Sequence, residues 1–176
     1  IEPATFVPSK SLVKTRRQAG WRFSCNQAFA DIIAACAAPR PYADDTWITA
    51  EIQAGYTALH KLGWAQSIEV WREDVLVGGL YGVTVGGIFC GESMFSRCRD
   101  ASKLAFWALM SLSRAWQVEL VDCQLENDHL LSLGATIMSR NDYLALLAQQ
   151  PETPTLPWSQ AHSTLAANGF AVAEVL

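Results

Sequence analysis

The central third of the chain alternates between short apolar runs and turn-forming residues. Apolar and β-branched residues concentrate at positions 65–72, 75–83 and 87–94, and each run has a length typical of a β-strand. Glu73 and Asp74 separate the first two runs, and residues 84–86 separate the second from the third. This pattern predicts a β-meander, in which three antiparallel strands follow one another along the chain.

Helices are predicted on both sides of the meander, from capping residues at their starts and from Gly or Pro at their ends. The expected helices lie at residues 9–18, 26–38, 49–62, 101–116, 127–133 and 140–149. The residues placed to cap four of them are Asn26, Thr49, Asp100 and Ser139. A polar loop is expected at residues 39–46. Further short strands are expected at residues 21–25, 118–123 and 136–138.

These elements predict an α+β fold, with a mixed β-sheet flanked by helices. A length of 176 residues and a hydrophobic content of 51% predict one domain with a substantial core. We assign residues 1–150 to this domain. Residues 151–176 are rich in Pro, Thr, Ser and Ala and have little periodicity, so we expect them to form an extended or peripheral C-terminal tail.

Composition narrows the class of protein. The longest apolar runs are far shorter than the roughly 20 residues that cross a bilayer, so we predict neither a membrane span nor a secretory signal. The five cysteines are odd in number and include no Cys-X-X-Cys pair, which argues against a disulfide framework and against a structural zinc site. We expect a cytoplasmic monomer that uses no metal and no other cofactor.

Charge is unevenly distributed along the chain. The formal net charge of −4 is unusual for a nucleic-acid-binding protein. Residues 1–40, however, carry six basic and two acidic side chains. Lys10, Lys14 and Arg17 are spaced so that they share one face of the first predicted helix. This face is either an RNA-binding patch on an acidic body or an ordinary solvated helix face.

Three polar side chains come at the ends of otherwise apolar predicted strands. Glu92 belongs to the third strand of the meander, and Asp122 and Gln124 come at the end of the strand predicted at 118–123. Burial of such groups without partners is costly, so they must face a cleft or be paired. The cations that could pair with them as structural ions are Arg97 or Arg99 for Glu92 and Lys103 for Asp122. From their positions alone, these residues could form either structural ion pairs or an active site.

Cysteine and histidine offer a second kind of chemistry. Cys123 lies between the two candidate polar residues, so on a strand its side chain points to the opposite face, and we expect it to fill the core. None of the three His residues has a signature for activating a thiol, which argues against covalent catalysis by cysteine. We expect His60 to be a packed structural residue. Asn127 and His129 open a short helix beside Asp122, where they either hold an anion or a carbonyl oxygen or simply cap the helix.

Several motifs follow one another in an order and spacing that are typical of one family. The most specific are Cys90-Gly-Glu-Ser-Met-Phe-Ser-Arg97, Asp100-Ala-Ser-Lys103 and Asp122-Cys-Gln124. The others are Thr46-Trp-Ile-Thr49, Leu59-His-Lys-Leu-Gly63, Ser67-Ile-Glu-Val-Trp71, Leu76-Val-Gly-Gly-Leu-Tyr-Gly82, Asn127-Asp-His129 and Ser132-Leu-Gly-Ala135. Over about residues 5–147 the chain resembles the bacterial leucyl/phenylalanyl-tRNA–protein transferases, which move an amino acid from a charged tRNA to a protein N-terminus.

The resemblance implies an aminoacyltransferase that moves Leu or Phe from Leu-tRNA or Phe-tRNA to the N-terminal Arg or Lys of acceptor proteins, in the N-end rule pathway of protein degradation. It implies that Asp122 and Gln124 handle the acceptor amino group, that Glu92 helps to fix it, and that Trp47 contacts the terminal adenosine of the tRNA. It also implies the fold of the acetyl-CoA-dependent N-acetyltransferases (GNAT-like). Those enzymes bind pyrophosphate with a Gly-rich loop, whereas residues 95–100 contain no Gly, so coenzyme A is not expected.

A donor side chain of Leu or Phe needs an apolar pocket. Residues of the right type near the predicted active strands, most of them expected in the core, are Leu80, Phe89, Met94, Phe106 and Leu120. The residues predicted to contact tRNA are Trp47, Lys10, Lys14 and Arg17.

Members of the family carry a small N-terminal domain before the segment that starts here near Thr5. The sequence given lacks that domain, so it is either a trimmed fragment or a short relative. Two alternative functions are open: an aminoacyl-tRNA-dependent ligase that modifies a small peptide or amine, and a non-catalytic tRNA-binding relative. A strict preference for basic protein N-termini would eliminate the ligase, and loss of activity on changing Asp122 or Gln124 would eliminate the non-catalytic relative.

Overall fold

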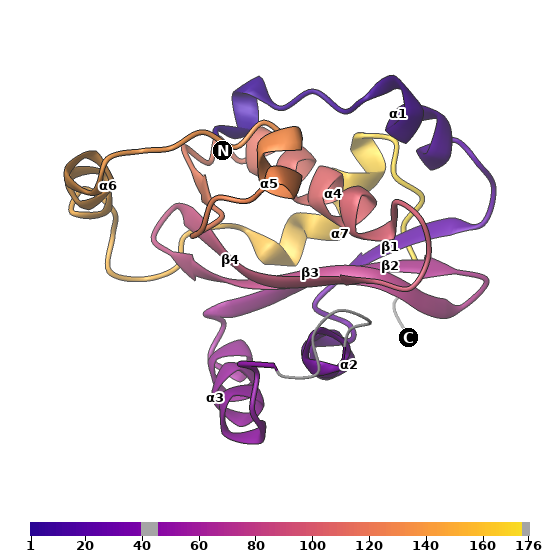
Figure 1. The fold of residues 1–176 in the computed structure, drawn as a ribbon, viewed down its shortest axis with the longest axis horizontal. Helices are drawn as coiled ribbons and strands as arrows, with labels where there is room; N and C mark the ends of the chain where they lie inside the picture. Colours follow the sequence, from indigo (N-terminus) through magenta and orange to yellow (C-terminus); the bar gives the residue numbers. More distant parts are fainter. Residues whose placement is uncertain (40–45, 174–176) are drawn as a thin grey trace.

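The computed structural model describes residues 1–39 and 46–173, and within these residues the strands form one central sheet (Figure 1). Its five strands lie in the order β1-β2-β3-β4-β5. Their bounds are β1 (Trp21–Cys25), β2 (Ala65–Arg72), β3 (Val75–Val85), β4 (Ile88–Ser96) and β5 (Val121–Asp122). Strands β1 to β4 pair antiparallel, whereas β5 pairs parallel to β4. The predicted meander, the mixed sheet and the α+β class are therefore confirmed.

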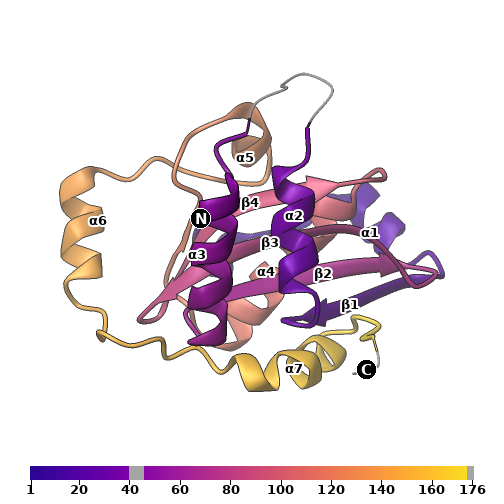
Figure 2. The same ribbon diagram turned by 90° about the horizontal axis from the view of Figure 1, so that it is seen from below.

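Helices cover both faces of the sheet (Figures 1 and 2). The face in front in Figure 2 carries α2 (Phe29–Ala37) and α3 (Ala50–Lys61). The other face carries α1 (Lys10–Arg16), α4 (Ala101–Ala115), α5 (Asp128–Ser132) and α7 (Ala161–Ala167). Two short 3-10 helices are η1 (Pro3–Thr5) and η2 (Trp158–Gln160). Helix α6 (Arg140–Leu147) lies apart from both layers, beyond the ends of the strands on the side of the turn between β3 and β4. In the part of the chain that the structure describes, none of these helices combines the length and the apolar character that crossing a bilayer requires.

Each face of the sheet has its own hydrophobic core. The larger cluster lies between the sheet and α4, and its members include Leu80, Phe89 and Phe106, each at most 3% exposed. The smaller cluster lies beneath α2 and α3 and includes Ile32 and Tyr81, which are fully buried. Full burial of one large apolar side chain contributes about 1.5–3 kcal/mol. Because β3 supplies residues to both clusters, the middle of the sheet is fixed from its two faces.

Local signals place most helix starts correctly, and two predicted caps are wrong. Thr49 and Ser139 cap α3 and α6 through side chains that accept main-chain hydrogen bonds. Asn26 lies outside α2 with a φ of 61°, and its Oδ1 accepts a hydrogen bond from the Ser67 amide at 2.9 Å. Asp100 occupies the N-cap position before α4, but its backbone is left-handed, with a φ of 67°, and its side chain makes no capping hydrogen bond. In both cases a tertiary contact takes the side chain away from the helix.

Two predicted strands in the second half of the chain differ from the structure. The strand expected at 118–123 is confined to Val121–Asp122, because its pairing with β4 stops after two residues. Residues 136–138 do not form a strand, and Ile137 is 76% exposed there, without a neighbouring strand to pair with. The polar loop expected at 39–46 falls mainly on residues 40–45, which lie outside the described residues.

The C-terminal segment packs into the domain. Helix α7 contributes Ala161 and Leu165 to the α4-side core, and Leu165 is 0% exposed. After α7, the chain runs beside β1. The Phe23 amide donates to the Ala171 carbonyl at 2.8 Å, and the Ala173 amide donates to the Phe23 carbonyl at 2.8 Å. The expectation of an extended or peripheral tail is therefore wrong for residues 158–173, because their apolar side chains complete the main core.

Candidate active site

The parallel ladder between β4 and β5 ends at Asp122, whose partner on β4 is Cys90. Directly after it, Gln124 adopts a left-handed backbone conformation with a φ of 64°, and its amide donates to Asp122 Oδ1 at 2.7 Å. The Gln124 side chain reaches back to β4, where Nε2 donates to the Gly91 carbonyl at 3.1 Å. The side-chain nitrogen of Gln124, Nε2, thus ties the end of β5 to β4. The side-chain oxygen, Oε1, takes no part in that hydrogen bond.

Glu92 lies in a β-bulge of β4. Gly82 of β3 pairs with Gly91, whereas the preceding residue of β3, Tyr81, pairs with Ser93. Glu92 is therefore the extra residue and has no partner directly opposite it. A bulge bends the strand and changes the direction of the extra side chain. This irregularity takes Glu92 out of the regular alternation of β4, beside the point where β4 and β5 separate.

The Glu92 carboxylate meets Tyr56 of α3. The Tyr56 hydroxyl hydrogen-bonds to Glu92, and burial, this hydrogen bond and the negative charge of Glu92 raise the pKa of Tyr56. Tyr56 is therefore a protonated donor at neutral pH. Its ring packs edge-on against the fully buried ring of Tyr81, with 5.2 Å between the centroids. The two rings close the site on the side of α3.

Asp122 faces a tyrosine of its own, Tyr143 of α6. The Tyr143 hydroxyl hydrogen-bonds to the Asp122 carboxylate and lies 4.0 Å from Cys90 Sγ. Burial raises the pKa of Tyr143, and the hydrogen bond and the charge of Asp122 raise it further. Each candidate carboxylate thus contacts a protonated tyrosine, and the two tyrosines come from different helices.

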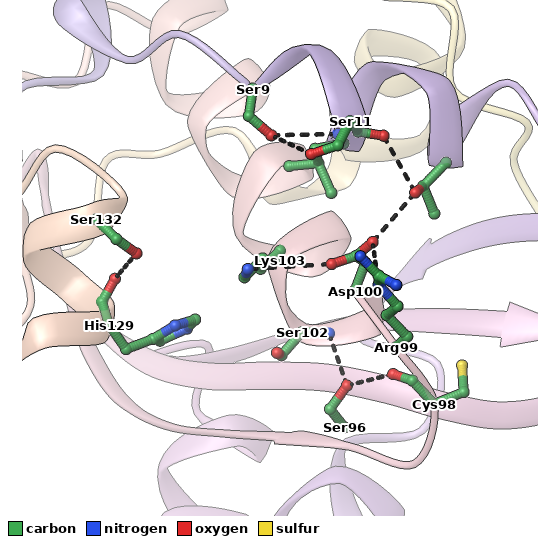
Figure 3. Close-up of polar contacts among 12 residues, drawn as sticks. Ser9, Ser11, Ser96, Cys98, Arg99, Asp100, Ser102, Lys103, His129 and Ser132 are labelled. Carbon is green, nitrogen blue, oxygen red and sulfur yellow. Dashed lines mark hydrogen bonds and ion pairs between the residues drawn. The ribbon is translucent and has the colours of Figure 1, made fainter.

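Neither Glu92 nor Asp122 forms an ion pair with another residue that the structure describes. The Lys103 Nζ, which the sequence offered as a partner for Asp122, lies 4.0 Å from Asp100 Oδ1 instead (Figure 3). The guanidinium of Arg97, offered as a partner for Glu92, donates to a main-chain carbonyl of β3 at 3.0 Å. The interpretation of the two carboxylates as structural ions therefore has no support within the described residues.

A hollow of about 410 Å³ opens beside Asp122. Its polar lining includes Asp122, Gln124 and Tyr143, and its apolar lining includes Leu131 and Ile137. Arg140 also lines the hollow, but it forms no ion pair with Asp122. A carboxylate that is not in an ion pair with a described residue, next to an amide oxygen, suits a ligand that carries an ammonium or amine group. Nowhere in residues 1–39 and 46–173 do three His, Cys, Asp or Glu side chains come together as the ligands of a metal ion would.

Comparison with known proteins assigns this chain to a family. The family model described as "Leucyl/phenylalanyl-tRNA protein transferase" matches residues 1–148. The chain belongs to this family. The protein named leucyl/phenylalanyl-tRNA–protein transferase from Pseudomonas fluorescens (strain SBW25) is 52% identical over 159 residues, which cover 90% of this chain and 70% of the relative.

Other curated relatives with the same name agree. The protein from Shewanella frigidimarina (strain NCIMB 400) is 50% identical over 157 residues, which cover 86% of this chain and 67% of the relative. The protein from Psychrobacter cryohalolentis is 48% identical over 160 residues, which cover 84% of this chain and 58% of the relative. The chain thus spans about two thirds of the length of these relatives, between 58% and 70%.

The two cysteines at the candidate site, Cys90 and Cys123, are not activated as nucleophiles. Burial and the nearby charge of Asp122 raise the pKa of Cys90 to about 11. Burial also raises the pKa of Cys123. The nucleophilic form of cysteine is the thiolate, so both side chains are unreactive thiols at neutral pH. Cys123 is partly buried against the α4-side core, as predicted, but it lies after the end of β5 and lines the same hollow as Asp122, so its placement on the opposite face is not confirmed.

The residues of α5 cap this short helix. Asn127 Oδ1 accepts a hydrogen bond from the Leu130 amide at 2.9 Å, which is ordinary capping. His129 and Lys103 face the same space between α5 and α4 (Figure 3). Partial burial and the charge of Lys103 lower the pKa of His129, so its imidazole is neutral at neutral pH. His60 stacks on a phenylalanine of α2 at 4.2 Å between ring centroids, which confirms it as a packed structural residue.

The residues predicted to contact the donor lie in several places. Leu80, Phe89 and Phe106 fill the α4-side core, and Met94 is partly buried against it. Leu120 lines the hollow beside the site. Their role as a side-chain pocket stays a prediction.

The predicted tRNA contacts are at the surface. Trp47 is 51% exposed just before α3. Lys10, Lys14 and Arg17 are exposed along α1 and just after it, on the opposite side of the sheet from α3 (Figure 1). RNA binding by these residues stays a prediction.

Sequence reasoning missed two side chains of the site, Tyr56 and Tyr143. Both lie on helices that were predicted correctly, but neither belongs to a spacing that signals catalysis. A buried hydroxyl usually finds a polar partner, so an aromatic residue with a polar tip on a half-buried helix was a weak signal. Which carboxylate each tyrosine meets depends on how α3 and α6 pack against the sheet, and that packing cannot be read from local sequence.

Proposed function

We propose that this chain transfers the aminoacyl group of a charged tRNA to the α-amino group of an acceptor protein, with Leu or Phe as donor and N-terminal Arg or Lys as acceptor. The observation that supports this most is the group of Glu92, Asp122 and Gln124 at the end of the β4–β5 ladder. These residues lie within the part of the chain that matches the family model, and the curated relatives carry the name of this activity.

The chemistry needs no covalent nucleophile, because the ester that joins an amino acid to tRNA is already activated. The acceptor nitrogen attacks the ester carbonyl carbon, the bond from that carbon to the ribose oxygen breaks, and the oxygen takes up a proton as the tRNA leaves. The α-amine of a protein has a pKa of about 7.7–8.0, so a useful fraction is neutral at pH 7. The protein therefore has to position the amine and accept one proton.

We assign these two tasks to the three polar side chains. Asp122 accepts the amine proton, directly or through a water molecule. Gln124 Oε1 accepts a hydrogen bond from the amine and aims its lone pair, since Nε2 of the same amide is held by the Gly91 carbonyl. Glu92 fixes the amino group from the side of α3, with its own orientation set by Tyr56. Correct placement of this kind is worth several kcal/mol of the barrier.

For the donor, we propose that Trp47 stacks on the terminal adenosine, a contact worth about 1–3 kcal/mol. The basic face of α1, formed by Lys10, Lys14 and Arg17, would contact phosphates of the acceptor stem. The Leu or Phe side chain of the donor would use the apolar set Leu80, Phe89, Met94, Phe106 and Leu120. Asn127 and His129 are further candidate contacts, to an anion or a carbonyl oxygen.

We further propose that the sheet is of the N-acetyltransferase type. Support comes from the parallel pair of β4 and β5, which parts after two residues to open the site. The segment before α4 contains no Gly, and the Asp100 carboxylate at its end would repel pyrophosphate, which disfavours coenzyme A. Cys25, Cys90, Cys98 and Cys123 are free thiols. They support a reducing cytoplasm, where charged tRNA is made and where products with N-terminal Leu or Phe would enter degradation.

The decisive test is transfer of labelled Leu from Leu-tRNA to a peptide with N-terminal Arg. Asp122→Asn keeps the shape of the side chain but removes proton acceptance, so we expect kcat to fall about 10²–10⁴-fold, with a smaller effect on the affinity for charged tRNA. Cys123→Ala, at the next residue in the chain, serves as the matched control and should retain most activity. No transfer by the intact, folded protein would refute the proposed function. Equal losses in kcat and tRNA affinity would mean that Asp122 is structural.

A substrate panel separates the alternatives. A ligase for small amines would act on free amines and on peptides without regard to the first residue, whereas the proposed transferase should require N-terminal Arg or Lys. A non-catalytic tRNA-binding relative would show no dependence of any measured function on Asp122→Asn or Gln124→Ala.

A further inference from the structure

Helix α6 contributes one side chain to the site, although the helix itself lies apart from both layers (Figure 1). Its residues Asn141, Asp142 and Leu144 are exposed, whereas Tyr143 between them is half-buried. Tyr143 lines the hollow beside Asp122. An aromatic side chain that turns from a largely exposed helix into a polar hollow is placed there by a specific contact.

That contact is with Asp122. The Tyr143 hydroxyl lies 4.0 Å from Cys90 Sγ, the residue paired with Asp122 across the ladder, and it faces the Asp122 carboxylate in the hollow that both residues line. The Asp122 carboxylate already accepts the Gln124 amide on Oδ1 at 2.7 Å. Two donors from fixed positions, one on the main chain and one on a helix, leave the carboxylate little freedom to rotate. The lone pairs of the carboxylate that accept neither hydrogen bond then point in one fixed direction.

We propose that Tyr143 is a positioning residue for the transfer reaction, holding the Asp122 carboxylate in the orientation in which it receives the proton of the acceptor amine. This inference rests on the proposed function, in which Asp122 is the proton acceptor. It adds one side chain of α6, the Tyr143 hydroxyl, to the active site.

A purely mechanical role for Tyr143 is the competing explanation, and the structure provides a way to separate the two. The chain leaving α6 has its own anchor, because Gln150 Oε1 accepts a hydrogen bond from the Gly87 amide at 3.0 Å. This anchor does not involve Asp122. Tyr143→Phe removes only the hydroxyl and keeps the ring in place, whereas Gln150→Ala weakens the attachment of the helix and leaves the hydroxyl.

The experiment compares these two variants with the wild type in the full-length protein, with Leu-tRNA and an N-terminal Arg peptide. Loss of a hydrogen bond to a charged group predicts that Tyr143→Phe lowers kcat roughly tenfold to a hundredfold. The KM for each substrate and the thermal midpoint should stay close to wild type, and Gln150→Ala should keep kcat within about twofold. In an Asp122→Asn background, Tyr143→Phe should have little further effect, because the group it orients is gone.

The outcomes are distinct. No transfer by the wild type would remove the proposed function itself. A wild-type enzyme that is active and a Tyr143→Phe variant with unchanged kcat would overturn the positioning role alone. Equal kcat losses in Tyr143→Phe and Gln150→Ala, accompanied by lower thermal midpoints, would show that Tyr143 only anchors α6.

Discussion

Replacing Leu165 with Ala should destabilise the whole protein, although Leu165 belongs to a segment that the sequence alone assigns to a tail. Leu165 is 0% exposed in the α4-side core, next to Phe170 and Ala161 of the same segment. The backbone after α7 then runs along β1 through hydrogen bonds with Phe23. We therefore expect α7 to unfold together with the sheet and not before it.

The expected magnitude follows from the burial. A buried Leu→Ala change costs about 2–5 kcal/mol, and the cost falls when the surroundings can close the cavity. Helix α7 is a short outer helix, so it can move partly inward, and we expect about 2–4 kcal/mol for Leu165→Ala. In a domain of this size each 1 kcal/mol lowers the thermal midpoint by about 2–4 °C, so the midpoint should fall by roughly 5–15 °C.

Urea unfolding followed by tryptophan fluorescence, with circular dichroism for the thermal midpoint, measures the effect. The urea midpoint should fall while the slope m stays constant, because the folded state keeps its extent of burial. Leu144→Ala is the matched control: the same change at a position of α6 that is 46% exposed should stay within about 0.5 kcal/mol of wild type. If the two variants behave alike, α7 is not part of the cooperative core, and the stability inferred from its burial is refuted.

Three further results are expected. Changing Lys10, Lys14 and Arg17 together to Ala should weaken tRNA binding. The slope of log affinity for tRNA against log salt concentration should fall by roughly one unit or less per residue, and peptide affinity should not change. Unchanged tRNA binding would mean that this is an ordinary solvated helix face. Burial and the Lys103 charge keep the pKa of His129 in the folded protein below its usual 6.5. Between that lower pKa and pH 6.5 the unfolded state therefore binds more protons than the folded state. The free energy of unfolding should fall as the pH drops through this range. His129→Gln should reduce this loss between pH 7 and pH 5 in urea titrations, and an identical pH dependence would contradict it. Gly82→Ala, whose Cβ would lie 2.3 Å from the Cys90 carbonyl oxygen, should cost about 1–3 kcal/mol, whereas Gly55→Ala on α3, where nothing lies within 4 Å, should be neutral or stabilising in the same assay.

The elements that local chemistry determines could be predicted from the sequence. The turn at Glu73 and Asp74 has two consecutive residues with positive φ, 51° and 65°, as a tight hairpin between two apolar runs requires. Thr49 and Ser139 mark helix starts because a side-chain oxygen next to free main-chain amides is a local interaction. The same reasoning failed for Asn26, whose oxygen bonds to the Ser67 amide, 41 residues away along the chain.

What the sequence could not provide depends on tertiary packing. The short helix α7 buries Ala161 and Leu165, four residues apart, which is too little periodicity to separate a packed helix from a tail. The polar set of Glu92, Asp122 and Gln124 was found because polar residues at strand ends are conspicuous. Its two tyrosines were not found, because the contact of Tyr143 with Asp122 exists only once α6 is placed beside the strand ends, near the turn between β3 and β4.

The distribution of charge in the fold suits a protein that must hold two kinds of substrate. Glu92 and Asp122 contact tyrosine hydroxyls and form no ion pair among the residues described, so their charge is available to attract an amino group. The same charge repels RNA phosphates. A tRNA can therefore bring its 3′ end to this edge only if its helical stem is held elsewhere, by positive charge outside the acidic site. The exposed side chains of Lys10, Lys14 and Arg17, which we propose as that positive charge, lie across the sheet from α3, so the proposed contacts with RNA and with an amine are spatially separate.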